Sequence, residues 1–412
     1  MKTTTRFSSV AFLNLIFLGL FTLQLTRAQS YVVIDLGTPG NSGSYSDPHG
    51  INQSAAVVGE WEATNSVFPQ AFIYSQGTNT SLGTVSAIAY GINDSNHIVG
   101  ESGAVNTHAF LYTNGVMTDL GTIAGTYSVA WAINNSDQVV GESTTSNLPN
   151  PPIHAVWYHS GAKTDLGTLT NGDYSSAFGI NDSNVIVGES SVLSGNTYAF
   201  ICTNNGGMVS LGTLGGNYSS ARAINNSGQI VGESFTANGD THAFLYSGGM
   251  TDLGTFGGNY STASAINNAG QVVGYATTAG GDARAFLFKG TNLFDLNNLI
   301  SPSSVCTNLI SADGINDRGQ ITGSGFTASG AYHAFLLTPS VTLTAPVVLA
   351  NGQFKLTVQG MPGQQFILQA TTNLTARWTP LSTNTAANGT LICTDAAAAN
   401  FHYRFYRARL LP

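Results

Sequence analysis

One short signature recurs seven times along the chain and constrains its fold more than any other feature. It is Ile-Asn followed by a glycine seven residues after the asparagine. The asparagines are Asn52, Asn93, Asn134, Asn181, Asn225, Asn267 and Asn316, and the glycines are Gly59, Gly100, Gly141, Gly188, Gly232, Gly274 and Gly323. Successive copies lie 41 to 49 residues apart, a period typical of β-propeller blades. A solenoid is the competing architecture, but it would need capping repeats at both ends.

The stretch from Ser219 to Thr255 predicts four short strands within one repeat. Residues 219–225, 229–233, 242–246 and 250–253 show the alternation or the apolar runs of strands. Turn-forming residues separate them, at Asn226-Ser-Gly and at Gly248-Gly. Four antiparallel strands in each repeat of this length are the pattern of a propeller blade.

The two ends of the array predict how it closes. The first three strand types occur seven times after residue 45, whereas the fourth occurs six times and the last repeat stops at residues 333–335. The missing copy is Val-Ile-Asp-Leu at residues 33–36, ahead of the first repeat. An N-terminal strand that completes the last blade would leave no exposed sheet edge. The prediction is therefore an all-β, seven-bladed β-propeller with four-stranded blades.

The first 28 residues predict a secretory signal peptide. Lys2 and Arg6 form a basic start, residues 10–25 are almost wholly apolar, and Ala28 supplies a small residue for cleavage. The apolar run is short for a membrane span. We expect a secreted, extracellular protein with the propeller at 29–338, a linker at 339–350 and a small all-β domain at 351–412.

Charge and cysteine content narrow the partners. Without residues 1–28, 10 Lys and Arg remain against 21 Asp and Glu. This excess of acidic residues disfavours nucleic acid and anionic membranes, so neither nucleic-acid binding nor membrane insertion is expected. Cys202, Cys306 and Cys393 are too few for a disulfide framework, although one pair could form. We expect a monomer.

The third-strand motif His-Ala-Phe occurs at His108, His242 and His333, and Asp-Leu-Gly-Thr occurs at Asp119, Asp165 and Asp252. In this combined motif the chain resembles the extracellular HAF-repeat proteins of bacteria. The resemblance covers residues 31–338. It implies the repeat fold and says little about activity. The departures are Gln70, Tyr198 and Arg284 in place of His, and Val156 in place of Phe.

Residues 339–412 lack the repeat signature. Alternating apolar residues at 354–358, 366–368 and 403–405 predict a small all-β unit. The segment 368–374, with Trp378 and Phe405-Tyr-Arg, is similar to tail domains of secreted proteins from Verrucomicrobia-type bacteria. It also resembles a fibronectin-type-III-like sandwich loosely.

The repeated His and Asp side chains predict structural roles. Copies of the His in different blades lie too far from the axis to share one ion, since strands are about 4.8 Å apart. We expect a hydrogen bond within each blade, to the Glu that ends the second strand, as in Glu101/His108. The Asp of Asp-Leu-Gly-Thr is expected to stabilise a turn. No metal and no cofactor is predicted, because the spacing of a calcium loop is absent.

Two sets of residues are candidates for ligand binding. Three residues before the signature Asn the residue type varies freely, whereas its neighbours stay small. The variable residues are His49, Tyr90, Trp131, Phe178, Arg222, Ser264 and Asp313. Seven residues before the Asn a tyrosine recurs, at Tyr45, Tyr127, Tyr174, Tyr218 and Tyr260. Tyr90, Trp131, Phe178, Arg222 and these five tyrosines could stack on and hydrogen-bond a sugar, although packing between blades remains the alternative.

The sequence contains no nucleophile elbow, phosphate loop or paired-carboxylate motif. We expect a secreted non-enzymatic binding or scaffold protein that recognises an extracellular polysaccharide or another surface protein through the propeller mouth. Two alternatives stay open. One is a polysaccharide hydrolase or lyase with His49 and Asp313 as its acid–base pair. The other is a purely structural adhesion module.

Overall fold

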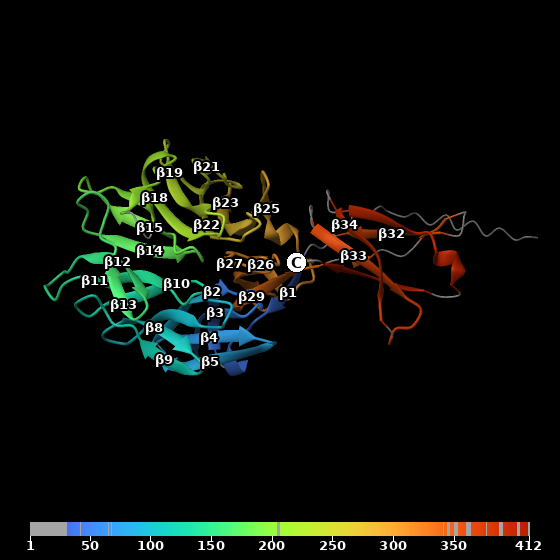
Figure 1. The fold of residues 1–412 in the computed structure, drawn as a ribbon, viewed down its shortest axis with the longest axis horizontal. Coiled ribbons are helices and arrows are strands. Elements are labelled where there is room, and N and C mark those ends of the chain that lie inside the picture. Colours follow the sequence, from blue (N-terminus) through green and yellow to red (C-terminus); the bar gives the residue numbers. More distant parts are fainter. Residues whose placement is uncertain are drawn as a thin grey trace, which may run out of the picture.

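The computed structural model describes residues 31–410, except 42, 65, 67, 204–206, 341, 344–346, 350–352, 360–363, 376, 387–389 and 402–403. The predicted signal peptide at 1–28 lies outside the described residues. The fold is all-β and propeller-like, built from antiparallel sheets of mostly four strands (Figure 1). Within these described residues, three 3-10 turns interrupt the strands: η1 (Pro39–Asn41), η2 (Leu296–Asn298) and η3 (Ala398–Asn400).

Each repeat contributes one strand of each type, except that the last repeat has a first strand in two pieces and no fourth strand of its own. The first strands are β2 (Gly43–Ile51), β6 (Ala87–Ile92), β10 (Ser128–Ile133), β14 (Ser175–Ile180), β18 (Gly215–Ile224), β22 (Gly257–Ile266) and the pair β26 (Cys306–Leu309) and β27 (Gly314–Ile315). The second strands are β3 (Val57–Ala63), β7 (Ile98–Ser102), β11 (Val139–Thr144), β15 (Ile186–Ser191), β19 (Ile230–Thr236), β23 (Val272–Thr278) and β28 (Ile321–Thr327).

The outer strands follow in the same order. The third strands are β4 (Gln70–Ser75), β8 (His108–Thr113), β12 (Ile153–His159), β16 (Thr197–Cys202), β20 (Thr241–Tyr246), β24 (Ala283–Lys289) and β29 (Tyr332–Pro339). The fourth strands are β5 (Thr78–Val85), β9 (Val116–Asp119), β13 (Ala162–Asp165), β17 (Val209–Ser210), β21 (Met250–Asp252) and β25 (Asn292–Asp295). In the repeat that starts at Ser219, all four strands lie where the sequence predicts them, within a few residues.

The last repeat takes its outer strand from the N-terminus. Strand β1 (Tyr31–Asp35) pairs antiparallel with β29, in a register that places Val33 opposite Leu337. Tyr31 is fully buried, and its backbone N–H donates to the carbonyl of Leu299. The predicted pairing of the N-terminal strand with the last repeat is thereby confirmed.

The hydrophobic core lies between neighbouring sheets. In one cluster Val140 and Ala155 of one repeat pack with Ala177 and Phe200 of the next. The Ala and Phe of the third-strand motif supply much of this core, since the side chains of Phe72, Phe110, Phe200, Phe244, Phe286 and Phe335 are almost wholly buried. Each sheet is therefore stabilised by its neighbours rather than by a core of its own.

The third-strand His bonds to a different partner from the predicted one. His108 Nδ1 lies 2.8 Å from Asp119 Oδ2 on the fourth strand, not beside Glu101. The equivalent pairs are His154–Asp165, His242–Asp252 and His333–Asp35. Glu101 pairs with Ala109, one position from His108, so the two side chains point to opposite faces of the sheet.

The aspartate of this pair also holds the turn that follows it, as predicted. The backbone N–H of Gly121 donates to Asp119 Oδ1 at 2.6 Å, and Gly37 does the same to Asp35 at 2.8 Å. Because Asp35 precedes the first repeat and also bonds His333, one carboxylate joins the two ends of the repeat array.

The C-terminal part folds as two antiparallel sheets. One contains β30 (Thr342–Leu343), β31 (Val347–Val348), β32 (Phe354–Gln359) and β35 (Thr390–Asp395), and the other contains β33 (Gln364–Thr371), β34 (Thr379–Ala386) and β36 (Phe405–Leu410). Leu356, Phe366 and Cys393 are buried in a core shared by both sheets.

The predicted linker at 339–350 is partly wrong. Strands β30 and β31 lie within it and pair with the two ends of β32. Their Val and Leu residues add an edge to the sheet, so this segment belongs to the C-terminal unit. Pro339 belongs to β29 and lies opposite Tyr31.

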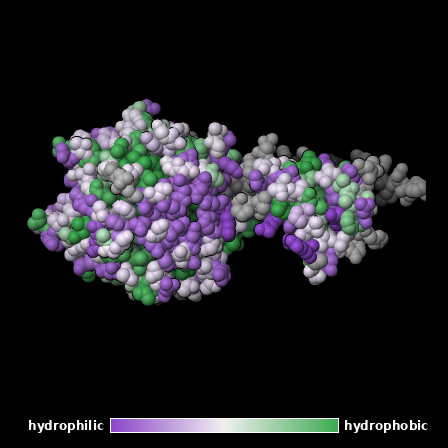
Figure 2. Space-filling view, viewed as in Figure 1, coloured by the Kyte–Doolittle hydropathy of each residue, from purple (hydrophilic) through white to green (hydrophobic). Residues whose placement is uncertain are grey.

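Three further observations concern the cysteines, the surface and the helices. Cys202, Cys306 and Cys393 form no disulfide and are buried. Figure 2 shows hydrophilic residues gathered over the middle of the visible face of the propeller body, with hydrophobic residues mostly towards its margin. No helix within the described residues is long and apolar enough to cross a membrane.

Candidate functional site

A β-bulge presents the variable residue of the first strand in six repeats. The pairing of the first strand with the second shifts by one residue there, for example between Ala130 and Ala132 around Trp131. The bulged residues are His49, Tyr90, Trp131, Phe178, Arg222 and Ser264. A bulge leaves one residue unpaired and redirects its side chain. This explains why the residue varies while its paired neighbours stay small.

Five of these side chains form a continuous row around the axis, here called the axial row: His49, Tyr90, Trp131, Phe178 and Arg222. The ring centres are 5.2 Å apart for His49 and Tyr90, 4.3 Å for Tyr90 and Trp131, and 5.7 Å for Trp131 and Phe178. The guanidinium carbon of Arg222 lies 4.7 Å from the centre of the Phe178 ring. Four residues predicted as ligand-binding, Tyr90, Trp131, Phe178 and Arg222, are thus in contact across consecutive repeats.

The five predicted tyrosines lie at a second level, beside a set of glutamates that sequence reasoning did not identify as part of the site. These glutamates, here called the glutamate arc, follow the signature glycine: Glu60, Glu101, Glu142, Glu189 and Glu233. The tyrosine hydroxyl donates to the carboxylate in Tyr127–Glu142 (2.7 Å), Tyr174–Glu189 (3.2 Å), Tyr218–Glu189 (3.3 Å), Tyr218–Glu233 (3.3 Å) and Tyr260–Glu233 (2.8 Å). The Tyr218–Glu189 and Tyr260–Glu233 bonds cross between repeats.

Tyr45 and Tyr90 belong to the same network. Burial and the charge of Glu60 raise the pKa of Tyr45 to about 12. The hydroxyl of Tyr90 donates to Glu101 Oε1 at 3.1 Å, so the axial row and the glutamate arc are directly linked. The Gly-Glu dipeptide, which recurs in five repeats, could have identified the arc. The sequence pattern instead predicts a hydrogen bond between its Glu and the third-strand His.

The proposed acid–base pair His49 and Asp313 has a different environment from the expected one. Burial lowers the pKa of His49. The negative charge of Asp47, rather than that of Asp313, acts against this effect. Asp313 accepts a hydrogen bond from the Ser311 hydroxyl at 2.8 Å. Among the described contacts no hydrogen bond joins His49 to Asp313.

Acidic groups crowd the seam between the last and the first repeat. Burial and the charge of Asp47 raise the pKa of Asp313 to about 8. The same two causes raise the pKa of Glu60 to about 7. Each carboxyl therefore holds its proton in the folded protein at a pH where an exposed carboxyl has lost it.

Stability is expected to fall as the pH rises from about 4 to about 8. The folded pKa of Asp313 exceeds its unfolded value of 3.8, so the folded state binds the extra proton across this window, and the full stability is present only below it. One extra proton bound by the folded state lowers the free energy of unfolding by at most about 1.4 kcal/mol for each unit that the pH rises. Denaturant unfolding of the wild type and Asp313→Asn at pH 5, 7 and 9 measures this. We expect a smaller slope in the variant, and an equal slope would contradict the assignment.

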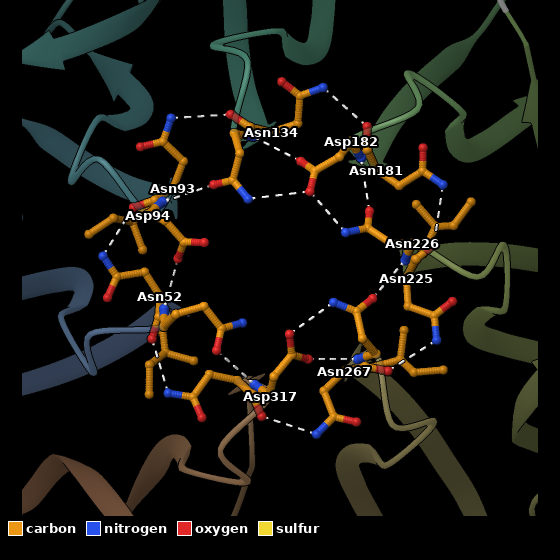
Figure 3. Close-up of a pocket in the computed structure, with 18 of the residues that line it drawn as sticks. Asn52, Asn93, Asp94, Asn134, Asn181, Asp182, Asn225, Asn226, Asn267 and Asp317 are labelled. Carbon is orange, nitrogen blue, oxygen red and sulfur yellow. Dashed lines mark hydrogen bonds between the residues drawn. The ribbon is translucent and has the colours of Figure 1, made fainter. Parts of the chain in front are cut away.

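A separate pocket lies at the C-terminal ends of the first strands, where the signature asparagines meet (Figure 3). It has a volume of about 230 Å³ and is lined in every repeat by the signature Ile, the Asn and the next residue. We call it the amide pocket. Sequence reasoning did not predict it.

The signature asparagines form a closed cycle of hydrogen bonds around this pocket. Each side-chain N–H donates to the backbone carbonyl of the next signature Asn at 3.0–3.2 Å, and Asn316 returns to Asn52. Each side-chain oxygen accepts backbone N–H groups two and four residues ahead, as from Ser136 and Gln138 to Asn134. The amide therefore closes its own turn and binds the neighbouring repeat.

The residues that follow the asparagines form a second cycle at the pocket rim. The side-chain oxygen of each of these residues accepts a hydrogen bond from the backbone N–H of the equivalent residue in the preceding repeat. The residues are Gln53, Asp94, Asn135, Asp182, Asn226, Asn268 and Asp317. Because these side chains and the amides are engaged in holding repeats together, we assign the pocket a mainly structural role.

The described residues contain no group of three or more His, Cys, Asp or Glu side chains placed to hold a metal ion. The described axis presents aromatic rings, hydroxyl groups, carboxylates and the Arg222 guanidinium.

Comparison with known proteins bears on the fold. No protein-family model and no curated protein sequence matches the chain. Among solved structures it is similar to a puromycin-hydrolysing peptidase of Mycobacterium tuberculosis, with a TM-score of 0.50 and 11% identity over 82% of this chain. This chain spans 62% of the length of that peptidase. A gluconolactonase of Xanthomonas campestris matches with a TM-score of 0.39 and 7% identity, over 75% of this chain and 90% of its own.

Proposed function

We propose that residues 31–339 form a seven-bladed β-propeller and that the chain is a secreted, non-enzymatic binding protein for an extracellular polysaccharide. The closed cycle of seven signature asparagines supports the blade number, because each repeat bonds one neighbour on either side. Residues 1–28 support secretion.

The axial row is the observation that carries this proposal. Tyr90, Trp131 and Phe178 come from consecutive repeats, are half-buried and contact each other around one axis. Aromatic faces bind the apolar faces of sugar rings, and nearby hydroxyl groups and carboxylates bind sugar hydroxyls. The tyrosines and the glutamate arc supply those polar groups beside the row.

The environment of His49 favours binding over catalysis. A general base must reach its substrate and be held by an orienting partner. The lowered pKa of His49 is consistent with a neutral imidazole, but its Nε2 is buried and has no hydrogen-bond partner in the described structure.

The proposal predicts loss of binding when the axial row is truncated. The mature protein, residues 29–412, is screened on a polysaccharide array with and without EDTA. Tyr90→Ala and Trp131→Ala should each weaken binding about tenfold or more, since a stacked aromatic contributes over 1 kcal/mol. Phe68→Ala is the control, because Phe68 is an aromatic side chain with 43% exposure that lies outside the axial row.

The other outcomes separate the alternatives. Release of reducing ends or unsaturated sugars, stopped by His49→Ala, would replace the proposal with a hydrolase or lyase. Binding abolished by EDTA would show that a metal ion takes part. Absence of any glycan binding by the folded protein would overturn the proposal and favour a protein partner or a structural adhesion module.

A further inference from the structure

We infer that the polysaccharide bound at the axis carries free amino groups, and that the glutamate arc and the axial row together bind their ammonium form. This inference rests on the proposed function, because it names the class of glycan taken at the same site. The ligand class is an amino-sugar polymer without N-acetyl groups.

The first argument is an imbalance of charge at the site. Glu142 and Glu233 are each 6% exposed. The Glu142 carboxylate accepts a hydrogen bond from the Tyr127 hydroxyl, and the Glu233 carboxylate accepts one from the Tyr260 hydroxyl. Among the described residues, a single recorded ion pair involves the arc, between Arg222 and Glu233. A buried carboxylate is costly unless a cation or a proton neutralises it. Burial raises the pKa of Glu60 and of Glu101, so a proton can neutralise these two. The other three carboxylates outnumber the one paired guanidinium and leave a site that favours a cation.

The second argument is that the protein already binds a cation of its own in this way. The Arg222 guanidinium lies over the Phe178 ring, and its Nη2 donates to Glu233 Oε1 at 3.1 Å. A ring face and a carboxylate thus hold one cation together, a combination that is favourable when desolvated.

Neighbouring repeats carry the same combination without an arginine. The Tyr90 hydroxyl donates to Glu101 and the Tyr127 hydroxyl donates to Glu142, and no recorded ion pair in the described residues involves either carboxylate. These two repeats are adjacent, and the ring centres of Tyr90 and Trp131 lie 4.3 Å apart. At this part of the axis an external ammonium group would supply the positive charge that the Arg222 guanidinium supplies beside Phe178 and Glu233.

The third argument is independent of charge. Trp131 Nε1 and His49 Nε2 are buried ring nitrogens with no hydrogen-bond partner in the described structure. Buried polar groups of folded proteins almost always have a partner. Both atoms belong to the axial row and are covered in this structure, so a ligand would supply the missing partners only where the rings move apart to admit its hydroxyl oxygens. A sugar provides hydroxyl groups, and an amino sugar adds the cation.

The test compares matched oligosaccharides by calorimetry: the hexamers of β-1,4-linked glucosamine and N-acetylglucosamine, which share a backbone and differ in charge. The glucosamine hexamer should bind the mature protein at least about tenfold more tightly, and the advantage should shrink at high salt. The double variant Glu101→Gln and Glu142→Gln should bring the two affinities to within about threefold, because the amide keeps the hydrogen-bond acceptor and loses the charge.

Asp94→Asn is the matched control, since it removes one carboxylate charge at the amide pocket and keeps the acceptor for the Gln53 N–H. It should leave both affinities unchanged. Equal binding of the two hexamers would overturn the amino-sugar inference and leave the proposed glycan function standing. Tight binding of glucosamine that survives the double glutamine variant would also overturn it. Binding of neither hexamer by the folded protein would overturn the proposed function itself.

Discussion

Gly141→Ala is expected to lower the free energy of unfolding by more than about 3 kcal/mol, or to prevent folding. A Cβ at this position would overlap the backbone carbonyl oxygen of Val129 and lie 2.8 Å from its carbonyl carbon. Both atoms belong to the first strand, which pairs directly with the second and cannot move away. Denaturant unfolding monitored by circular dichroism measures the loss.

Gly249→Ala is the control for this prediction. Gly249 lies in a turn between the third and fourth strands of its repeat, and a Cβ there would meet no atom within 4 Å. We expect its stability to stay within about 0.5 kcal/mol of the wild type. If Gly141→Ala were equally mild, close approach of the first strand could not be the reason for the repeated glycine.

Asn134→Asp is expected to destabilise the protein by about 3–5 kcal/mol. The residue is 4% exposed, and its side-chain N–H groups donate to Asn181 O at 3.1 Å and to Asn184 Oδ1 at 2.8 Å. A carboxylate at this position would face two oxygens, so two hydrogen bonds become repulsive contacts. Thermal unfolding at pH 7 measures the change.

The matched control is Asn106→Asp, which makes the same chemical change at an exposed residue. Its melting temperature should be close to that of the wild type. Equal losses in both variants would mean that the added charge acts through the whole surface. In that case the asparagine cycle would not hold the repeats together.

The repeat and its strands could be predicted because they depend on local pattern. Residues 219–253 alternate or turn according to side-chain type, and the surplus strand at 33–36 has one place left to pair. In the C-terminal unit the same alternation predicted strands within β32 and β33 and at the start of β36, but β34 and β35 were not predicted. The edge strands β30 and β31 were not predicted either, since two-residue apolar segments carry no period.

The site was predictable only in part. Free variation at Tyr90, Trp131 and Phe178 indicated the axial row. A residue that is not paired in the sheet can be large, whereas its paired neighbours must stay small. The glutamate arc was misassigned, since Glu101 and His108 are close in the motif but lie on opposite faces of the sheet. Strand register decides faces, and a one-residue difference reverses them.

The amide pocket shows the same limit. Asn134 is recognisable as a turn residue, and its side-chain oxygen does hold its own turn. Its amide N–H bonds a repeat 47 residues away, a contact that no local pattern encodes. The sequence by itself determined the repeat, the strand order and the residues free to vary, because these follow from side-chain periodicity along one chain. Only the tertiary structure decided which side chains meet on the axis, because bulges and strand register set their direction after the sheets have packed.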